Sequence, residues 1–303
     1  MTRRLASLML LFYPLAFRRR YGGEMRALLD QTPTRVLTLL DLLRGAFAAH
    51  LRPPASLAGV VNRDDRLRAS TSGVLACWVA FAAAGFGFYK TTEDHGGLGN
   101  AHPVLGGAHF TVQALAILGC VGVLVGALPL VLLALGHTRR DQSLWIPVSV
   151  TVLAVLVFAA LTGVLVLVGH SHPSRTPTTV GGVAFIAWGL AGLACGAVCV
   201  LASRKVLFAV PLARVWLVAA LACATIVSAA MAAMALATAV YAIVLPFDAA
   251  AVGGSANGPL GAISTNLSLI VQLIVMAIAG GLAVTTTRRG WRAVRQPDTP
   301  ETA

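Results

Sequence analysis

Histidine is the residue type whose grouping in this chain most suggests chemistry. Five of the seven histidines lie in two polar gaps between apolar stretches, accompanied by Glu93 and Asp94: His95, His102, His109, His170 and His172. Imidazole binds zinc and changes its charge near neutral pH. The gaps therefore predict either a divalent metal site, with His170 and His172 as its closest pair, or a pH sensor. Because the spacing is loose, solvated loop histidines are the alternative interpretation.

The rest of the chain offers few groups for catalysis. No Asp, Glu, Lys, Arg or His lies well inside an apolar stretch, where proton relays and intramembrane hydrolases need such groups. The sequence also lacks the GxxxxGK[ST] phosphate loop, the HExxH zinc motif and the GxSxG nucleophile motif. The five cysteines are typical of small buried apolar residues, although Cys195 and Cys199 are one helical turn apart. We expect a non-catalytic protein without a cofactor.

The composition predicts the elements that carry these residues. With 57% hydrophobic residues, 11% charged residues and a mean hydropathy of +0.82, a soluble globule is excluded. Six apolar stretches are long enough to cross a hydrocarbon core of roughly 30 Å as helices. We predict an all-α six-helix membrane bundle with spans at 73–89, 111–135, 144–169, 180–202, 215–245 and 263–284. Residues 206–213, which contain Pro211, predict a short interfacial piece.

The basic residues predict the orientation. Of the 23 lysines and arginines, all but Lys90 and Arg175 lie in the N-terminal region, two alternate turns or the C-terminal tail. The positive-inside rule then places both termini in the cytoplasm. Trp145 and Trp216 fall at the predicted inner boundaries, where indole rings are favoured. The arginine-, alanine- and glycine-rich composition fits a GC-rich bacterium, so we expect the bacterial cytoplasmic membrane.

Small residues predict how the spans pack. Gly122 and Gly126 form one GxxxG pair, and Gly192 and Gly196 form another. Such pairs allow two helix backbones to approach closely. Packing within the bundle is the main interpretation, and homodimerisation is the alternative.

Outside the spans, the sequence predicts a basic helical head at 1–70, ahead of the membrane domain at 71–287, and a short disordered basic tail at 288–303. Thr32 and Pro33 are typical of a helix start. The predicted helix carries an apolar stripe formed by Val36, Leu40, Leu43, Phe47 and Leu51. We expect this stripe to pack within the head or lie on the membrane; docking of a partner protein is the alternative. The arginines at 18–20 suit anionic lipid, whereas no recognised DNA-binding motif accompanies them, so no nucleic acid is expected.

The start of the head carries a recognisable pattern. Its matching residues are Tyr13, Pro14, Phe17, Arg18, Arg20, Tyr21, Gly22, Glu24 and Met25. This pattern resembles the permease-prefix motif found ahead of FtsX/MacB-like ABC permease cores and at the start of six-span membrane proteins of high-GC bacteria. The chain departs from the motif at Arg19 and Gly23, where an acidic residue is common. The resemblance implies that these residues contact lipid or a cytoplasmic partner.

Two hypotheses follow. The first is a permease-like or regulatory membrane subunit whose head contacts a cytoplasmic ATPase or regulator. The second is a metal- or pH-responsive membrane protein that uses the outer histidines.

Overall fold

The computed structural model describes residues 10, 13, 15–31, 38–39, 41–42, 45–46, 49, 63–92, 98–138, 144–171, 179–254 and 264–295. Those residues contain helices and no strand. The helices are α2 (Leu15–Gln31), α4 (Arg63–Thr92), α5 (Leu98–Ala101), α6 (Pro103–Thr138), α7 (Trp145–Ser171), α8 (Thr179–Ala209), α9 (Arg214–Asp248), α10 (Ala250–Gly253) and α11 (Thr265–Arg295).

Six of these helices, α4, α6, α7, α8, α9 and α11, are long and apolar enough to cross a membrane. The shortest, α7, has 27 residues and the longest, α6, has 36, whereas about 20 are needed. Their outward faces carry large apolar side chains, such as Leu124 (68% exposed), Leu153 (61%) and Leu190 (62%). An apolar surface of this extent suggests a membrane protein. The six-helix, all-α prediction is confirmed for the described residues.

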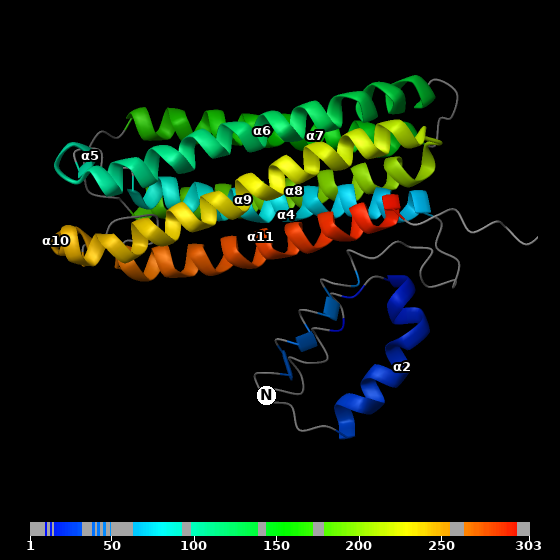
Figure 1. The fold of residues 1–303 in the computed structure, drawn as a ribbon, viewed down its shortest axis with the longest axis horizontal. Coiled ribbons are helices and arrows are strands. Elements are labelled where there is room, and N and C mark those ends of the chain that lie inside the picture. Colours follow the sequence, from blue (N-terminus) through cyan, green and yellow to red (C-terminus); the bar gives the residue numbers. More distant parts are fainter. Residues whose placement is uncertain are drawn as a thin grey trace, which may run out of the picture.

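The six helices run alternately up and down, so the bundle has two distinct ends (Figure 1). We call one the basic end: α4, α7 and α9 begin there, and α6, α8 and α11 finish there. Every described Lys or Arg of the six helices lies in their turns at this end, apart from Lys90. The other end, where α4 meets α5 and α9 meets α10, is called the opposite end.

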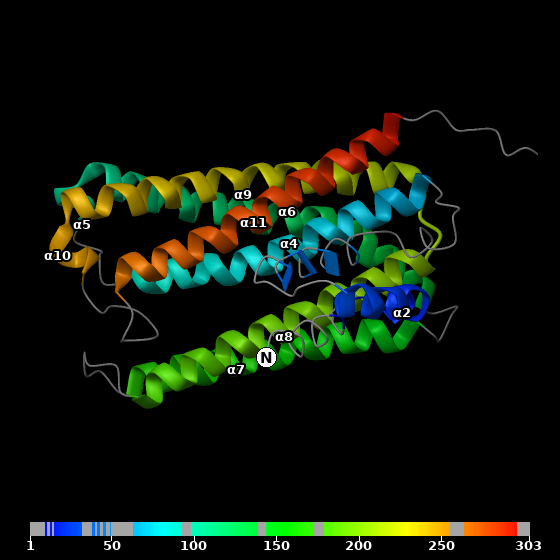
Figure 2. The same cartoon turned by 90° about the horizontal axis from the view of Figure 1, so that it is seen from below.

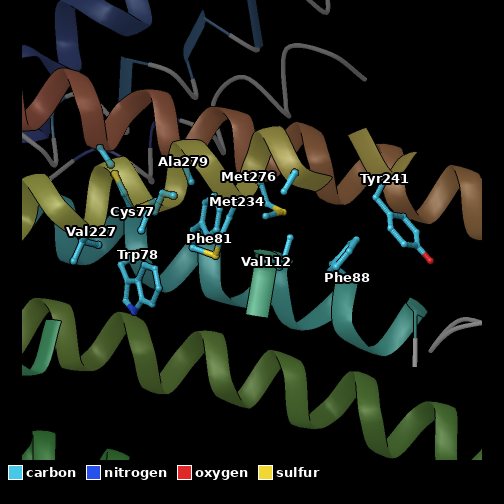
Figure 3. Packing of buried hydrophobic residues seen from close by; sticks show 14 of the residues in the cluster. Cys77, Trp78, Phe81, Phe88, Val112, Val227, Met234, Tyr241, Met276 and Ala279 are labelled. Carbon is cyan, nitrogen blue, oxygen red and sulfur yellow. The ribbon is translucent and has the colours of Figure 1, made fainter. Parts of the chain in front are cut away.

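Four helices form the core of the bundle. Helix α4 packs against α11 and α9, and α9 packs against α6 and α11. Helices α7 and α8 form a hairpin that joins the core through α8 on α4 and is set apart from the other four (Figure 2). Phe81 and Phe88 of α4, Met234 of α9 and Met276 of α11 are almost fully buried between the core helices (Figure 3).

Helix α9 lies at the centre of the core, packed against α6, α11 and α4, and it buries residues along its whole length. The residues buried at helical spacing along it include Leu217, Leu221, Ala224, Val227, Met231, Met234, Thr238, Tyr241 and Leu245. Gly280 of α11 lies against the backbone of Met231, with 3.9 Å from the position of a Cβ atom to the Met231 carbonyl carbon. Close backbone approach of this kind is the usual packing mode of helices in lipid.

Several helices run past the predicted span boundaries. Helix α4 begins at Arg63 rather than residue 73, and its first turn holds Asp64 and Asp65, which favour the positive end of the helix dipole. Helix α6 begins at Pro103 rather than residue 111, and proline suits the first helical position. Hydropathy falls at such polar turns, although the helix does not stop there.

Two predictions at the basic end are corrected. Residues 206–209, predicted as part of an interfacial piece, are the last turn of α8, which ends ahead of Pro211. Residues 288–295, predicted as the start of a disordered tail, continue α11 as helix; Arg292 and Arg295 in its last turn suit the negative end of the dipole. Residues 296–303 lie outside the described residues.

Candidate functional site

The aromatic residues of the motif build the interior of the N-terminal head, by which we mean the described residues between 10 and 49. Tyr13 is only 6% exposed and stacks on Phe17 at 5.1 Å between ring centroids, and Phe17 contacts Tyr21 at 4.9 Å. Tyr13 clusters with the buried Leu10 and Ala46. Met25 packs on the same cluster from the third turn of α2. These four motif residues therefore lie toward the inside of the head.

The segment that faces α2 is helical at positions 38–39, 41–42, 45–46 and 49. The Tyr13 hydroxyl lies where a side chain on Gly45 would begin, so glycine allows the two segments to approach. Burial, and to a lesser extent the Asp41 carboxylate, raise the pKa of Tyr13, which keeps the hydroxyl neutral. The five residues of the predicted apolar stripe between Val36 and Leu51 all lie outside the described residues. Pro14 of the motif does as well.

The charged residues of α2 point the other way. Arg19, Glu24 and Arg26 are exposed, and the guanidinium of Arg20 lies over the Tyr21 ring at 5.5 Å from its centroid. Arg18 is half-buried. The motif is thus divided: its aromatic and methionine side chains lie toward the cluster, whereas two of its three charged side chains, Arg20 and Glu24, are exposed.

The four predicted packing glycines all contact other helices of the same chain. A Cβ atom at Gly122 or Gly126 would lie 2.9 Å from Val227 or Cys223 of α9. A Cβ atom at Gly192 would lie 2.8 Å from the Phe158 ring of α7. At Gly196 it would overlap the Val79 side chain of α4. Contacts within the bundle use all four positions.

The structure describes the side chains of two of the five predicted histidines, His102 and His109. His102 lies 4.0 Å from Asp248, whereas His95 and His172 are outside the described residues, as is the side chain of His170 at the end of α7. His109, predicted in an outer loop, lies on α6 instead, beside the Phe88 and Tyr89 rings. Its Nε2 atom is buried without a partner among the described residues.

Nowhere in the described part of the chain do three His, Cys, Asp or Glu side chains gather as a metal site would require. The metal- and pH-responsive hypothesis stays a prediction. Among the described residues, no acidic or histidine side chain joins Cys195 and Cys199 on α8, and Cys199 Sγ lies 4.0 Å from the Thr151 carbonyl oxygen.

Polar side chains inside the bundle join helices to one another. Gln272 of α11 donates from Nε2 to Thr91 Oγ1 of α4 at 3.0 Å, and Ser228 of α9 and Thr287 of α11 share a hydrogen bond of 2.9 Å. In the hairpin, Trp188 donates from Nε1 to Thr162 Oγ1 at 2.9 Å. The sequence alone could not have paired these polar groups.

Sequence reasoning missed a cavity of about 290 Å³ near the basic end. Its walls come from α4, α6, α7, α8 and α9, and they are almost wholly apolar. Its only polar side chains are hydroxyls such as those of Thr71 and Thr151, which donate to carbonyl oxygens of their own helices. No sequence signal could have revealed it, since its lining consists of the valine, leucine, alanine and glycine residues that fill every span.

Comparison with protein-family models, curated proteins and solved structures found no match to this chain. The interpretation of these features therefore depends on the chemistry of the residues themselves.

Proposed function

We propose that this chain is a non-catalytic integral membrane protein, a permease-like or regulatory subunit, whose N-terminal head contacts a cytoplasmic partner such as an ATPase or a regulator. It resides in the bacterial cytoplasmic membrane with both termini in the cytoplasm. The observation that carries the proposal is the divided motif of the head. A surface that keeps its charged side chains exposed on a folded helix is suited to binding another molecule.

The outward face of α2 supports a protein partner. Arg19, Arg26 and Asp30 are exposed and, at spacings of seven and four residues, lie on one side of α2, so both signs of charge share that face. Anionic lipid alone would favour a uniformly basic face. Mixed charges on one face instead fit the polar rim of a protein interface.

The basic end of the bundle supports the orientation. An arginine at mid-span costs roughly 2.5–3.5 kcal/mol on insertion scales, and cytoplasmic segments carry the excess of basic residues. The described helices place their basic residues at one end, with Lys90 as the exception. The N-terminal head leads into the start of α4 at this end, and the C-terminal segment follows the end of α11 there. The head would therefore face the cytoplasm.

Affinity purification of the tagged full chain in a mild detergent tests the proposal. We expect a specific soluble partner to be recovered with the native chain and lost with the double variant Arg19→Glu/Arg26→Glu. These exposed residues lie outside the aromatic cluster of the head, so the substitutions leave its interior unchanged.

Arg289→Glu is the matched control, because Arg289 is also exposed but lies on α11. It should retain the partner. Recovery of no partner, or equal recovery with both variants, would show that the face of α2 is not the binding surface.

A further inference from the structure

The cavity near the basic end reaches the lipid-facing surface of the bundle. Val131 of α6 and Val152 of α7, which line it, are 49% and 54% exposed. On α6 the lining extends from Gly122 to Leu135, roughly 20 Å at 1.5 Å per residue. One leaflet of a bilayer provides about 15 Å of hydrocarbon. The cavity is therefore as deep as a single acyl chain in that leaflet.

A cationic group lies beside the mouth of this cavity. Arg68 is one helical turn from Thr71 and Ser72, the lining residues of α4 closest to the basic end. Its Nη1 donates to the carbonyl oxygen of Phe208 at 3.3 Å, and its Nε is buried without a hydrogen-bond partner in the described part of the chain. No described carboxylate lies within ion-pair distance of Arg68.

A second guanidinium, that of Arg204, adds positive charge near the end of α8. Arg204 lies over the Phe208 ring at 5.9 Å from its centroid, so the two arginines flank one residue at the end of α8. Lys205 is adjacent and exposed. A half-buried guanidinium without an acidic partner is costly unless an anion compensates its charge.

We propose that the cavity binds one acyl chain of an anionic phospholipid from the leaflet at the basic end, and that Arg68 holds its phosphate. The apolar walls bury the chain. The phosphate accepts a charge-assisted hydrogen bond from the Arg68 guanidinium, while Arg204 adds long-range attraction. The cavity is apolar and the groups beside its mouth are cationic. It therefore favours a phospholipid with a net negative charge over a zwitterionic one of equal chain length.

Photo-crosslinking of the purified full chain in neutral detergent tests this inference. The probes are phosphatidylglycerol and phosphatidylcholine that carry the same diazirine in the middle of one acyl chain. We expect phosphatidylglycerol to label peptides that line the cavity about tenfold more than phosphatidylcholine. Arg68→Gln should remove most of that preference: both lipids carry a phosphate, so the preference comes from the net charge of the headgroup, and a tenfold preference corresponds to about 1.4 kcal/mol. Arg68→Lys should retain most of it.

Two matched controls separate the site from general lipid contact. Arg289→Gln removes an exposed positive charge of α11 and should keep the preference. Val152→Trp should fill the cavity and abolish its labelling, whereas Val155→Trp, at a valine that is 56% exposed but not in the lining, should leave labelling unchanged. Equal labelling by both lipids, or equal effects of Arg68→Gln and Arg289→Gln, would overturn the proposal. Labelling unaffected by Val152→Trp would also overturn it.

Discussion

At the scale of single residues, the head and the bundle both depend on side chains that fit without spare room. Tyr13 stacks on Phe17 and its hydroxyl reaches Gly45, so a polar atom is placed inside a small cluster. In the bundle, Gly122 and Gly126 bring α6 against α9. Each position leads to a direct experiment.

Tyr13 gives the protein a pH dependence that belongs to the head. Burial raises the pKa of Tyr13 above its ordinary value of 10.0, so the folded head favours the neutral phenol. The stabilisation is complete below pH 10 and is lost as the pH rises from 10 through the folded-state pKa. In an ultraviolet titration of tyrosinate, the component removed by Tyr13→Phe should have its midpoint above 10. A midpoint at or below 10 would show that this hydroxyl is not buried.

Gly126→Leu should destabilise the bundle. Its Cβ would lie 2.9 Å from the Cβ of Cys223, and overpacking of this kind costs about 1–3 kcal/mol. Gly163→Leu is the control, since nothing lies within 4 Å of a Cβ there. Thermal unfolding in detergent should show a lower midpoint for Gly126→Leu only. Equal midpoints for the two variants would contradict the α6–α9 contact.

At the scale of elements, the α7–α8 hairpin is joined to the four-helix core by an aromatic cluster. The ring of Trp188 lies 4.4 Å from Phe86 of α4, 5.2 Å from Phe158 of α7 and 5.9 Å from Phe185 of α8. The cavity lies in the same region of contact between hairpin and core, closer to the basic end. The hairpin thus joins the core through α8 on α4, with the aromatic cluster at one part of that contact.

Trp188→Ala should weaken this attachment. The pair with Phe86 crosses to α4, whereas the pairs with Phe158 and Phe185 and the hydrogen bond to Thr162 lie within the hairpin. At about 0.5–1.5 kcal/mol for each of these four interactions, the expected loss is about 2–6 kcal/mol. Trp216→Ala is the comparison, because Trp216 lies at the start of α9 and is 42% exposed. Unfolding by titration with sodium dodecyl sulfate should separate the two variants. A loss for Trp216→Ala as large as that for Trp188→Ala would show that the cluster does not hold the hairpin.

Helix boundaries show what hydropathy can and cannot predict. The number of long apolar helices was predictable, because a run without charge must either cross lipid or be buried. The ends were not: α8 continues through Arg204 and Lys205, and α11 through Arg288 and Arg289. Arginine and lysine are good helix formers, so charge ends an apolar stretch without ending the helix.

The partners of each helix were also beyond the reach of the sequence. Gly196 is typical of a close contact, but nothing in its neighbours indicates Val79 as the contact. For the same reason the cavity and its arginine mouth emerge only from the three-dimensional arrangement. In the head, the motif residues were identifiable from the sequence, whereas their division into an inner and an outer face depends on how α2 packs.

At the scale of the whole molecule, the described residues form a six-helix bundle with a basic end, preceded by α2 and the residues between 10 and 49 that pack on it. The two proposals, a partner on the outward face of α2 and an anionic lipid at Arg68, both place the working surface at the basic end. Both therefore depend on that end facing the cytoplasm. The histidines at the opposite end would then face the outside of the cell.

The most direct test is the side of the membrane on which each end lies. Green fluorescent protein, which fluoresces in the bacterial cytoplasm, and alkaline phosphatase, which is active outside it, can be fused after Ala303 and between Thr92 and Leu98. We predict fluorescence without phosphatase activity for the C-terminal fusions, and phosphatase activity without fluorescence for the fusions between α4 and α5. Phosphatase activity at the C-terminus would contradict the six-span arrangement with a cytoplasmic basic end.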